Sequence, residues 1–220
     1  MGVVIETPAQ VLGLEESGMR SVMQRSQPEG SRSGPDDADR TLHSLRRFLR
    51  LATTGNPSIL MTFWAPVQFA TNDGRDLQGL GPSLVGRHVI PRYRGYMKAQ
   101  AERLLGIRGR SGHGRRGGGR EELVGQFGYD TKYAIHCARL GFQCLELLST
   151  DRLSLPMEGE PAEWLLNVRK GLVTFDEWWE RTLGPDAALE KLERDESLRA
   201  GPDAAAVEAW SIEVPLRHWH

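Results

Sequence analysis

The stretch that decides the fold runs from Asp130 to Thr150 and reads DTKYAIHCARLGFQCLELLST. Apolar side chains recur in it at intervals of four and three residues, which places them on one face of an α-helix. These side chains are Tyr133, Cys137, Leu140, Cys144 and Leu147. Asp130 precedes the run and is well placed to cap its first turn. The sequence therefore predicts a long helix with one face buried in a core.

The segments on either side predict an α+β fold class. Val3, Val4 and Ile5 are β-branched, which favours a strand at the N-terminus. Leu42, Leu45, Phe48, Leu49 and Ala52 recur at helical spacing, and Gly55-Asn56-Pro57 then ends that helix. Further helices are expected near residues 58–64, 91–105, 164–170, 174–183, 186–198 and 203–210, with loops at 24–40 and 72–83. We predict a strand-containing domain, residues 1–85, followed by a helical domain, residues 86–220.

Composition and charge exclude several classes of protein. The chain has 28 Lys+Arg against 29 Asp+Glu, a formal net charge of -1, so no global field requires a nucleic-acid or membrane partner. Its apolar runs are too short to span a bilayer, and no basic segment precedes an apolar one at the N-terminus. Cys137 and Cys144 lie about 10.5 Å apart along the predicted helix, too far for a disulfide. We expect reduced thiols, a cytoplasmic location and no membrane partner.

A polar stripe runs along the 130–150 helix beside the apolar one. It consists of Lys132, His136, Arg139, Gln143 and Glu146. Two or three potential cations on one face suit the oxygens of a triphosphate or a phosphodiester, because Arg offers a fork of donors and Lys a point charge. The alternative is a solvated helix face with ordinary surface charges. The spacing alone leaves both interpretations open.

Two other charged segments also have two interpretations. Asp36, Asp37 and Asp39 form an acidic cluster that could hold Mg²⁺ beside a triphosphate, or cap the helix that follows. The Gly/Arg tract of residues 107–120 could bind a nucleic-acid backbone electrostatically, or form a flexible solvated loop.

Several stretches resemble a known family. Residues 37–48 (DADRTLHSLRRF) and 51–58 (LATTGNPS) are similar to predicted nucleotidyltransferases of the DNA polymerase beta superfamily, in the family related to bacterial RNA-repair polymerase beta-like proteins. That family pairs an acid with a serine-leucine-basic-basic-aromatic helix and a Gly-Asn-Pro turn. Residues 128–136 (GYDTKYAIH) and 168–171 (VRKG) resemble its helical half. The similarity extends over nearly the whole chain.

The resemblance implies a Mg²⁺-dependent transfer of a nucleoside monophosphate from a nucleoside triphosphate to an acceptor hydroxyl, on an RNA end or another molecule. It also implies a partial nucleotidyltransferase-type mixed sheet followed by a mostly helical domain. Asp39 is then the first choice, and Asp37 the second, for a catalytic carboxylate that binds the metal. The implied nucleotide-binding residues are Lys132, His136, Arg139, Asn56 and Tyr129.

The chain departs from the family's pattern at its beginning. In relatives, a Gly-Ser turn and an Asp-x-Asp strand precede a Gly-Val pair that matches Gly2-Val3 here. The resemblance would therefore place that turn and two of three metal-binding carboxylates before Met1. We expect an N-terminally truncated nucleotidyltransferase with weak or no activity. The alternatives are a non-catalytic nucleotide- or RNA-binding remnant and a destabilised fragment with an open sheet edge.

Overall fold

A computed structural model describes residues 1–12, 21–26, 39–106 and 118–219. The chain divides into two compact units. The first comprises Met1–Thr54 and Asp203–His220, and the second comprises Gly55–Pro202. The predicted α+β class is confirmed, because a small mixed sheet in the first unit is accompanied by a chain that is mostly helical towards its C-terminus.

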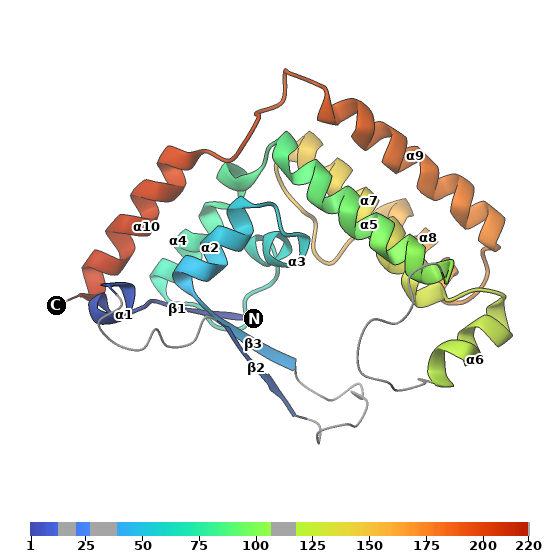
Figure 1. The fold of residues 1–220 in the computed structure, drawn as a ribbon, viewed down its shortest axis with the longest axis horizontal. Helices are drawn as coiled ribbons and strands as arrows, with labels where there is room; N and C mark the ends of the chain where they lie inside the picture. The colour runs from blue at the N-terminus through green and yellow to red at the C-terminus, as the bar shows by residue number, and fades with distance from the viewer. Residues whose placement is uncertain (13–20, 27–38, 107–117, 220) are drawn as a thin grey trace. The chain divides into compact units, whose positions relative to one another are not determined.

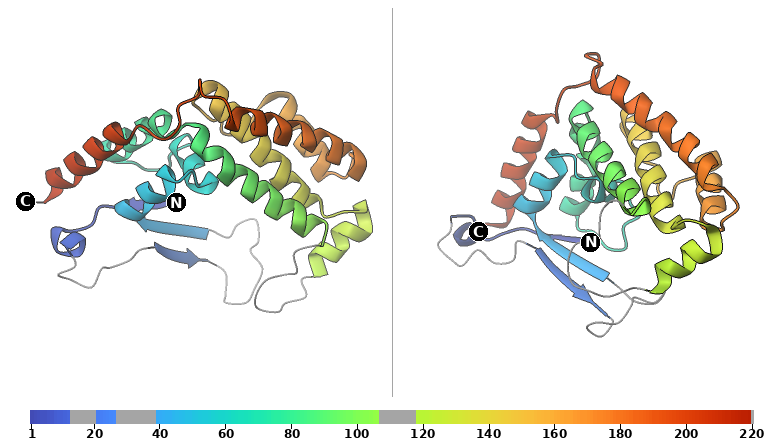
Figure 2. Two further views of the ribbon diagram at one scale, coloured as in Figure 1. Left: turned by 45° about the horizontal axis from the view of Figure 1, so that its top comes forward. Right: turned by 45° about the vertical axis from the view of Figure 1, so that its right-hand side comes forward.

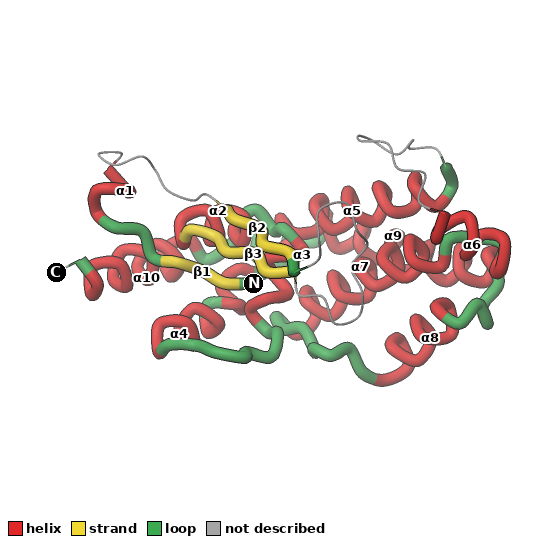
Figure 3. The backbone as a smooth tube through the Cα atoms, turned by 90° about the horizontal axis from the view of Figure 1, so that it is seen from below, coloured by secondary structure: helices red, strands yellow, loops and turns green. Residues whose placement is uncertain are grey.

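The sheet has three strands in the order β1-β3-β2 (Figure 3). They are β1 (Gly2–Val4), β2 (Ser21–Arg25) and β3 (Asp39–Ser44). β1 runs parallel to β3, with Val3 opposite His43, and β2 runs antiparallel to β3, with Met23 opposite Thr41. The predicted N-terminal strand is thus confirmed, and it pairs with a later segment of the chain.

Helix α2 (Leu45–Thr53) follows β3 directly, and Ser44 caps it by accepting a hydrogen bond from the backbone N–H of Arg47. Its buried residues are Leu45, Phe48, Leu49 and Ala52, as the helical spacing predicted. Leu42 was wrongly included in that helix, because its backbone pairs with strands on both sides. Helices α1 (Pro8–Leu12) and α10 (Ala204–His218) lie near α2 and complete this unit (Figures 1 and 2).

His43 makes the stability of the first unit dependent on pH. Its side chain is 7% exposed, and its Nδ1 lies 2.7 Å from Ser21 Oγ, a hydrogen bond between β3 and β2. Burial lowers the pKa of His43, and the nearby positive charge of Arg47 lowers it further. The folded state therefore resists protonation of this ring.

We expect the urea midpoint of unfolding to fall as the pH decreases below about 6.5, the ordinary pKa of histidine in an unfolded chain. The unfolded state then binds a proton that folded His43 does not, and stability decreases until the pH passes the folded pKa. A His43→Gln variant should show a flatter pH profile than the wild-type chain. His218→Gln, at an exposed position, is the control. Equal pH profiles for wild type and His43→Gln would contradict this assignment.

The second unit is helical within its described residues. Its elements are α3 (Pro57–Leu60), η1 (Met61–Phe63), α4 (Asn72–Gly79), η2 (Gly81–Leu84), η3 (Arg87–Val89), α5 (Ile90–Leu104), α6 (Gly118–Phe127), α7 (Thr131–Thr150), α8 (Gly159–Arg169) and α9 (Phe175–Glu193). The predicted loop at 72–83 was wrong, since Thr71 caps α4 by accepting from the backbone N–H of Gly74. The predicted break near Pro185 was also wrong, because α9 continues through it.

Helix α7 forms the centre of this unit and packs against α5, α8 and α9 (Figures 1 and 2). The close approach depends on small residues, most clearly on Gly141. A Cβ atom at Gly141 would lie 3.0 Å from Pro185 Cβ of α9 and 3.1 Å from Met97 Cε of α5. The predicted apolar stripe is confirmed, except that Tyr133 is only half-buried. Cys137 and Cys144 are free and buried.

The Gly-Asn-Pro turn at residues 55–57 requires glycine at its first position. Gly55 has φ +75°, and a Cβ atom there would lie 2.9 Å from Val89 Cα. Gly95, inside α5, has nothing within 4 Å of the corresponding position and no positive φ.

Gly55→Ala should lower the free energy of unfolding by about 1–3 kcal/mol, because it adds both backbone strain and a steric clash. Gly95→Ala should raise the same quantity by about 0.5–1 kcal/mol, since alanine restricts the unfolded chain and favours helix. Urea denaturation followed by circular dichroism measures both. A Gly55→Ala variant as stable as wild type would show that the turn tolerates a side chain.

Candidate functional site

Helix α7 places three of the predicted nucleotide-binding residues on one side. Asp130 begins the helix by accepting hydrogen bonds from the backbone N–H groups of Lys132 and Tyr133, at 3.0 and 3.2 Å. Lys132, His136 and Arg139 then follow at helical intervals of four and three residues. Lys132 is exposed, whereas the other two side chains are half-buried. We call these three side chains the cationic stripe.

Arg139 is the most unusual member of the cationic stripe. Its Nη2 donates to Nδ1 of His136 at 3.2 Å, which requires the histidine tautomer with Nδ1 unprotonated. Its Nε is buried and has no hydrogen-bond partner, and no carboxylate within the described residues forms an ion pair with it. Burial lowers the pKa of Arg139, although the guanidinium remains charged. A desolvated cation with an unpaired donor retains the capacity to bind one further acceptor.

Tyr93 of α5 supplies a second buried donor without a hydrogen-bond partner, at the interface between α5 and α7. Its side chain is fully buried, and its hydroxyl has no hydrogen-bond partner among the described residues. Burial raises the pKa of Tyr93, and the neighbouring charge of Arg139 acts in the opposite direction. The hydroxyl therefore stays protonated at neutral pH and can donate. Two buried donors without acceptors are a feature of ligand sites as well as of sites that hold water.

Glu146 and Gln143 show that the predicted polar stripe is not a simple solvated face. Gln143 is 4% exposed. Glu146 uses a carboxylate oxygen to accept from the backbone N–H of Ser154 at 2.8 Å, which fixes the chain after α7. The cationic stripe is therefore confined to the N-terminal half of α7.

Tyr93→Phe tests whether this hydroxyl contributes to the stability of the free protein. We expect the free energy of unfolding to stay equal or rise, because the change removes a buried polar group that has no partner. Thermal and urea unfolding of the two proteins measure it. A loss above about 1 kcal/mol would instead identify a stabilising hydrogen bond of the hydroxyl, for example to a buried water.

Tyr129 and Asn56, the two other predicted nucleotide-binding residues, make structural contacts. The Tyr129 hydroxyl donates to the carbonyl oxygen of Val173 at 2.7 Å, and its ring packs edge-on against Phe175. Asn56 Oδ1 accepts from the first backbone N–H groups of α3, and its Nδ2 donates to the Tyr96 hydroxyl at 3.3 Å. These contacts account for both side chains without a ligand, and their predicted binding role stays a prediction.

The predicted metal ligands lie in the first unit. Asp39 is the first residue of β3, where its backbone is opposite Arg25 of β2. Asp37 lies outside the described residues. Within the part of the chain that the structure describes, no group of three His, Cys, Asp or Glu side chains could hold a metal ion. The described residues therefore do not by themselves make a Mg²⁺ site.

Sequence reasoning identified Arg139 but missed Tyr93. An aromatic residue in an amphipathic helix is most often a packing residue, and the sequence around Tyr93 carries no sign that its hydroxyl is unpaired. Only the packing of α5 on α7 brings the two side chains into electrostatic contact.

The protein is of the α+β class. Its helical unit carries the cationic stripe and two buried donors without a hydrogen-bond partner, Arg139 Nε and the Tyr93 hydroxyl. The chain belongs to the RNA repair pathway DNA polymerase beta family, whose model matches residues 1–211. This match confirms the resemblance to polymerase beta-like nucleotidyltransferases. No match was found among curated proteins or among solved structures. Among the described residues, no helix has the length and apolar character needed to cross a membrane.

Proposed function

We propose that this protein binds a nucleoside triphosphate through the cationic stripe of α7 and transfers the nucleoside monophosphate to an acceptor hydroxyl. The observation that carries the proposal is the half-buried guanidinium of Arg139, whose Nε lacks a partner in a chain of a nucleotidyltransferase family. Phosphate oxygens are the acceptors that a planar guanidinium binds best. The family's name favours an RNA hydroxyl as the acceptor.

The chemistry assigns distinct roles to the three side chains. Arg139 binds phosphate oxygens at the buried end of the stripe, and its contact with His136 keeps the guanidinium in place. Lys132, exposed and without an ion pair among the described residues, adds a positive charge towards the N-terminus of α7. Partial burial strengthens such contacts, because water screens them less.

In the transfer step the acceptor oxygen attacks the α-phosphorus, and the bond between that phosphorus and the bridging oxygen breaks. Pyrophosphate leaves with the electron pair, and the hydroxyl proton passes to solvent. Positive charges that hold the triphosphate stabilise the charge that develops on the leaving group. The resemblance separately implies a Mg²⁺ ion with Asp39 and Asp37 as ligands, because carboxylate oxygens are the ligand type that Mg²⁺ prefers.

Arg139→Gln should weaken the binding of ATP about 10- to 100-fold, since it removes a charge-assisted contact worth about 1.5–3 kcal/mol. Lys132→Gln should have a smaller effect, because an exposed charge is screened by water. Arg169→Gln, which removes an exposed arginine of α8, is the charge-matched control and should bind ATP as wild type does. Equilibrium dialysis with labelled ATP, with and without Mg²⁺ and at two salt concentrations, measures these affinities.

A transfer assay separates the catalytic proposal from the non-catalytic alternative. Appearance of label on an RNA oligonucleotide, with release of pyrophosphate, supports nucleotidyl transfer. Salt-sensitive ATP binding without transfer supports a nucleotide-binding protein instead. Absence of ATP binding, or binding that is unchanged in Arg139→Gln, would remove the cationic stripe from the proposal.

A further inference from the structure

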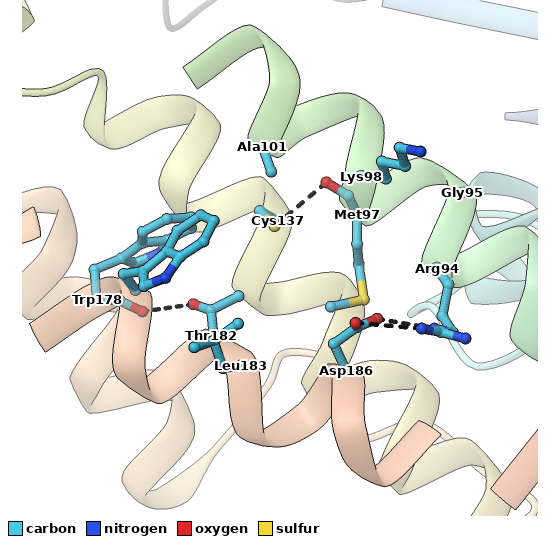
Figure 4. A pocket seen from close by; sticks show the side chains of 11 residues that line it. Arg94, Gly95, Met97, Lys98, Ala101, Cys137, Trp178, Thr182, Leu183 and Asp186 are labelled. Carbon is cyan, nitrogen blue, oxygen red and sulfur yellow. Dashed lines mark hydrogen bonds and ion pairs between the residues drawn. The ribbon is translucent and has the colours of Figure 1, made fainter. Parts of the chain in front are cut away.

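A groove on the other side of α7 has the features of a second binding site. It has a volume of about 350 Å³ and is lined by α5, α7 and α9 (Figure 4). Cys137 of α7 and Met97 of α5 are among its lining residues. Cys137 and Arg139 point about 200° apart around the helix axis, so the groove and the cationic stripe are on different faces of α7. The volume falls in the range of small-molecule pockets.

One end of the groove is closed by an ion pair. Arg94 of α5 donates through Nε to Oδ1 of Asp186 of α9 at 2.9 Å, and Glu190 and Glu193 also lie within 4 Å of its guanidinium. These three carboxylates raise the pKa of Arg94 and outnumber its single positive charge. Arg94 is therefore not available to an anionic ligand.

Lys98 is the positively charged lining residue that remains available to an anionic ligand. It lies one helical turn after Arg94 on α5, is exposed and has no ion pair among the described residues. A point charge at the rim of an apolar groove attracts one anionic group of a ligand whose remaining atoms enter the groove.

The wall formed by α9 offers aromatic surface. Trp178 is fully buried, and its Nε1 donates to the carbonyl oxygen of Ala134 at 3.1 Å. Trp179 is 37% exposed, and its ring stacks on Phe175 with an interplanar angle of 25°. Leu183, one turn further along the helix, is 51% exposed. Partly exposed indole and leucine side chains beside a pocket can cover a planar ring.

Two polar groups of the groove wall, those of Cys137 and Thr182, are already hydrogen-bonded within the protein. Cys137 Sγ donates to the carbonyl oxygen of Met97 at 3.4 Å, and Thr182 Oγ1 donates to that of Trp178 at 2.8 Å (Figure 4). Burial raises the pKa of Cys137 to about 12, so the thiol is neutral and unreactive at neutral pH. The flat face of a ring can therefore lie against this wall, whereas any polar edge of the ring must face the open side of the groove.

We propose that the groove between α5 and α9 binds a nucleobase together with its phosphate, with the ring against Trp179 and Leu183 and the phosphate beside Lys98. Every nucleobase has a flat face that stacks on an aromatic side chain, and the attached phosphate supplies the single anion that Lys98 requires. A smaller aromatic acid would leave much of the 350 Å³ unfilled. This site uses none of the residues of the cationic stripe. The nucleotide can be free or part of an RNA strand.

Equilibrium dialysis of the whole chain with labelled AMP tests this site. We expect Trp179→Leu and Lys98→Gln each to weaken AMP binding at least about fivefold. Phe69→Leu and Lys191→Gln, which remove an exposed aromatic ring and an exposed charge outside the groove, should leave it unchanged. The AMP binding that remains in Arg139→Gln should still depend on Trp179 and Lys98, which separates this site from the proposed triphosphate site. Lys98 is exposed, so its replacement tests binding without disturbing the core.

Competition experiments identify the chemistry and the source of the ligand. Adenosine should displace AMP only at higher concentration, and inorganic phosphate alone should not displace it. If hexa-adenylate competes more tightly than AMP, the groove binds a nucleotide of an RNA strand; if it does not compete, the groove binds free nucleotide. AMP binding that is absent at millimolar concentration, that persists in both Trp179→Leu and Lys98→Gln, or that is lost in Arg139→Gln would overturn the proposal.

Discussion

The close packing of α7 against α5 and α9 is the constraint on which the second unit depends. Gly141 makes it possible, because any side chain at that position would meet Pro185 and Met97 at about 3 Å. Protein interiors are packed at crystal-like density, so a helix that approaches two neighbours this closely has few alternative positions. The fixed position of the α7 backbone therefore determines where the side chains on each face of this helix lie.

This packing explains why a charged residue is half-buried in the interface. Arg139 follows Ala138 and precedes Leu140, both buried, and its charge interacts electrostatically with Tyr93. Burying a charge and a phenol without full hydrogen bonding costs free energy. Such costs are found mainly at functional sites, and for this reason the α5–α7 interface is the candidate site.

The elements that the sequence predicted correctly are those with a local signal. The apolar period of α7, its Asp130 cap and the Gly-Asn-Pro turn after α2 each depend on residues within a few positions of one another. Two of the errors concern long-range contacts, whereas the loop predicted at 72–83 overlooked a local cap, Thr71. Leu42 has helical spacing but belongs to a strand, because pairing with β1 and β2 outweighs a local period. The helices predicted at 174–183 and 186–198 leave a break at Pro185, yet α9 continues through this residue, which lies close to Gly141 of α7.

The same distinction applies to the candidate sites. Lys132, His136 and Arg139 could be found from spacing, since they share one helix face. Tyr93 and the groove at Lys98 could not, because they depend on which helix packs against α7. Nor does the net charge of -1 reveal them. Three carboxylates of α9 lie around Arg94, while Lys98, Lys132 and Arg139 have no carboxylate partner within the described residues. A chain that is almost neutral overall can therefore keep cations without carboxylate partners on two different helices, α5 and α7, because pairing in three dimensions decides which charges remain available.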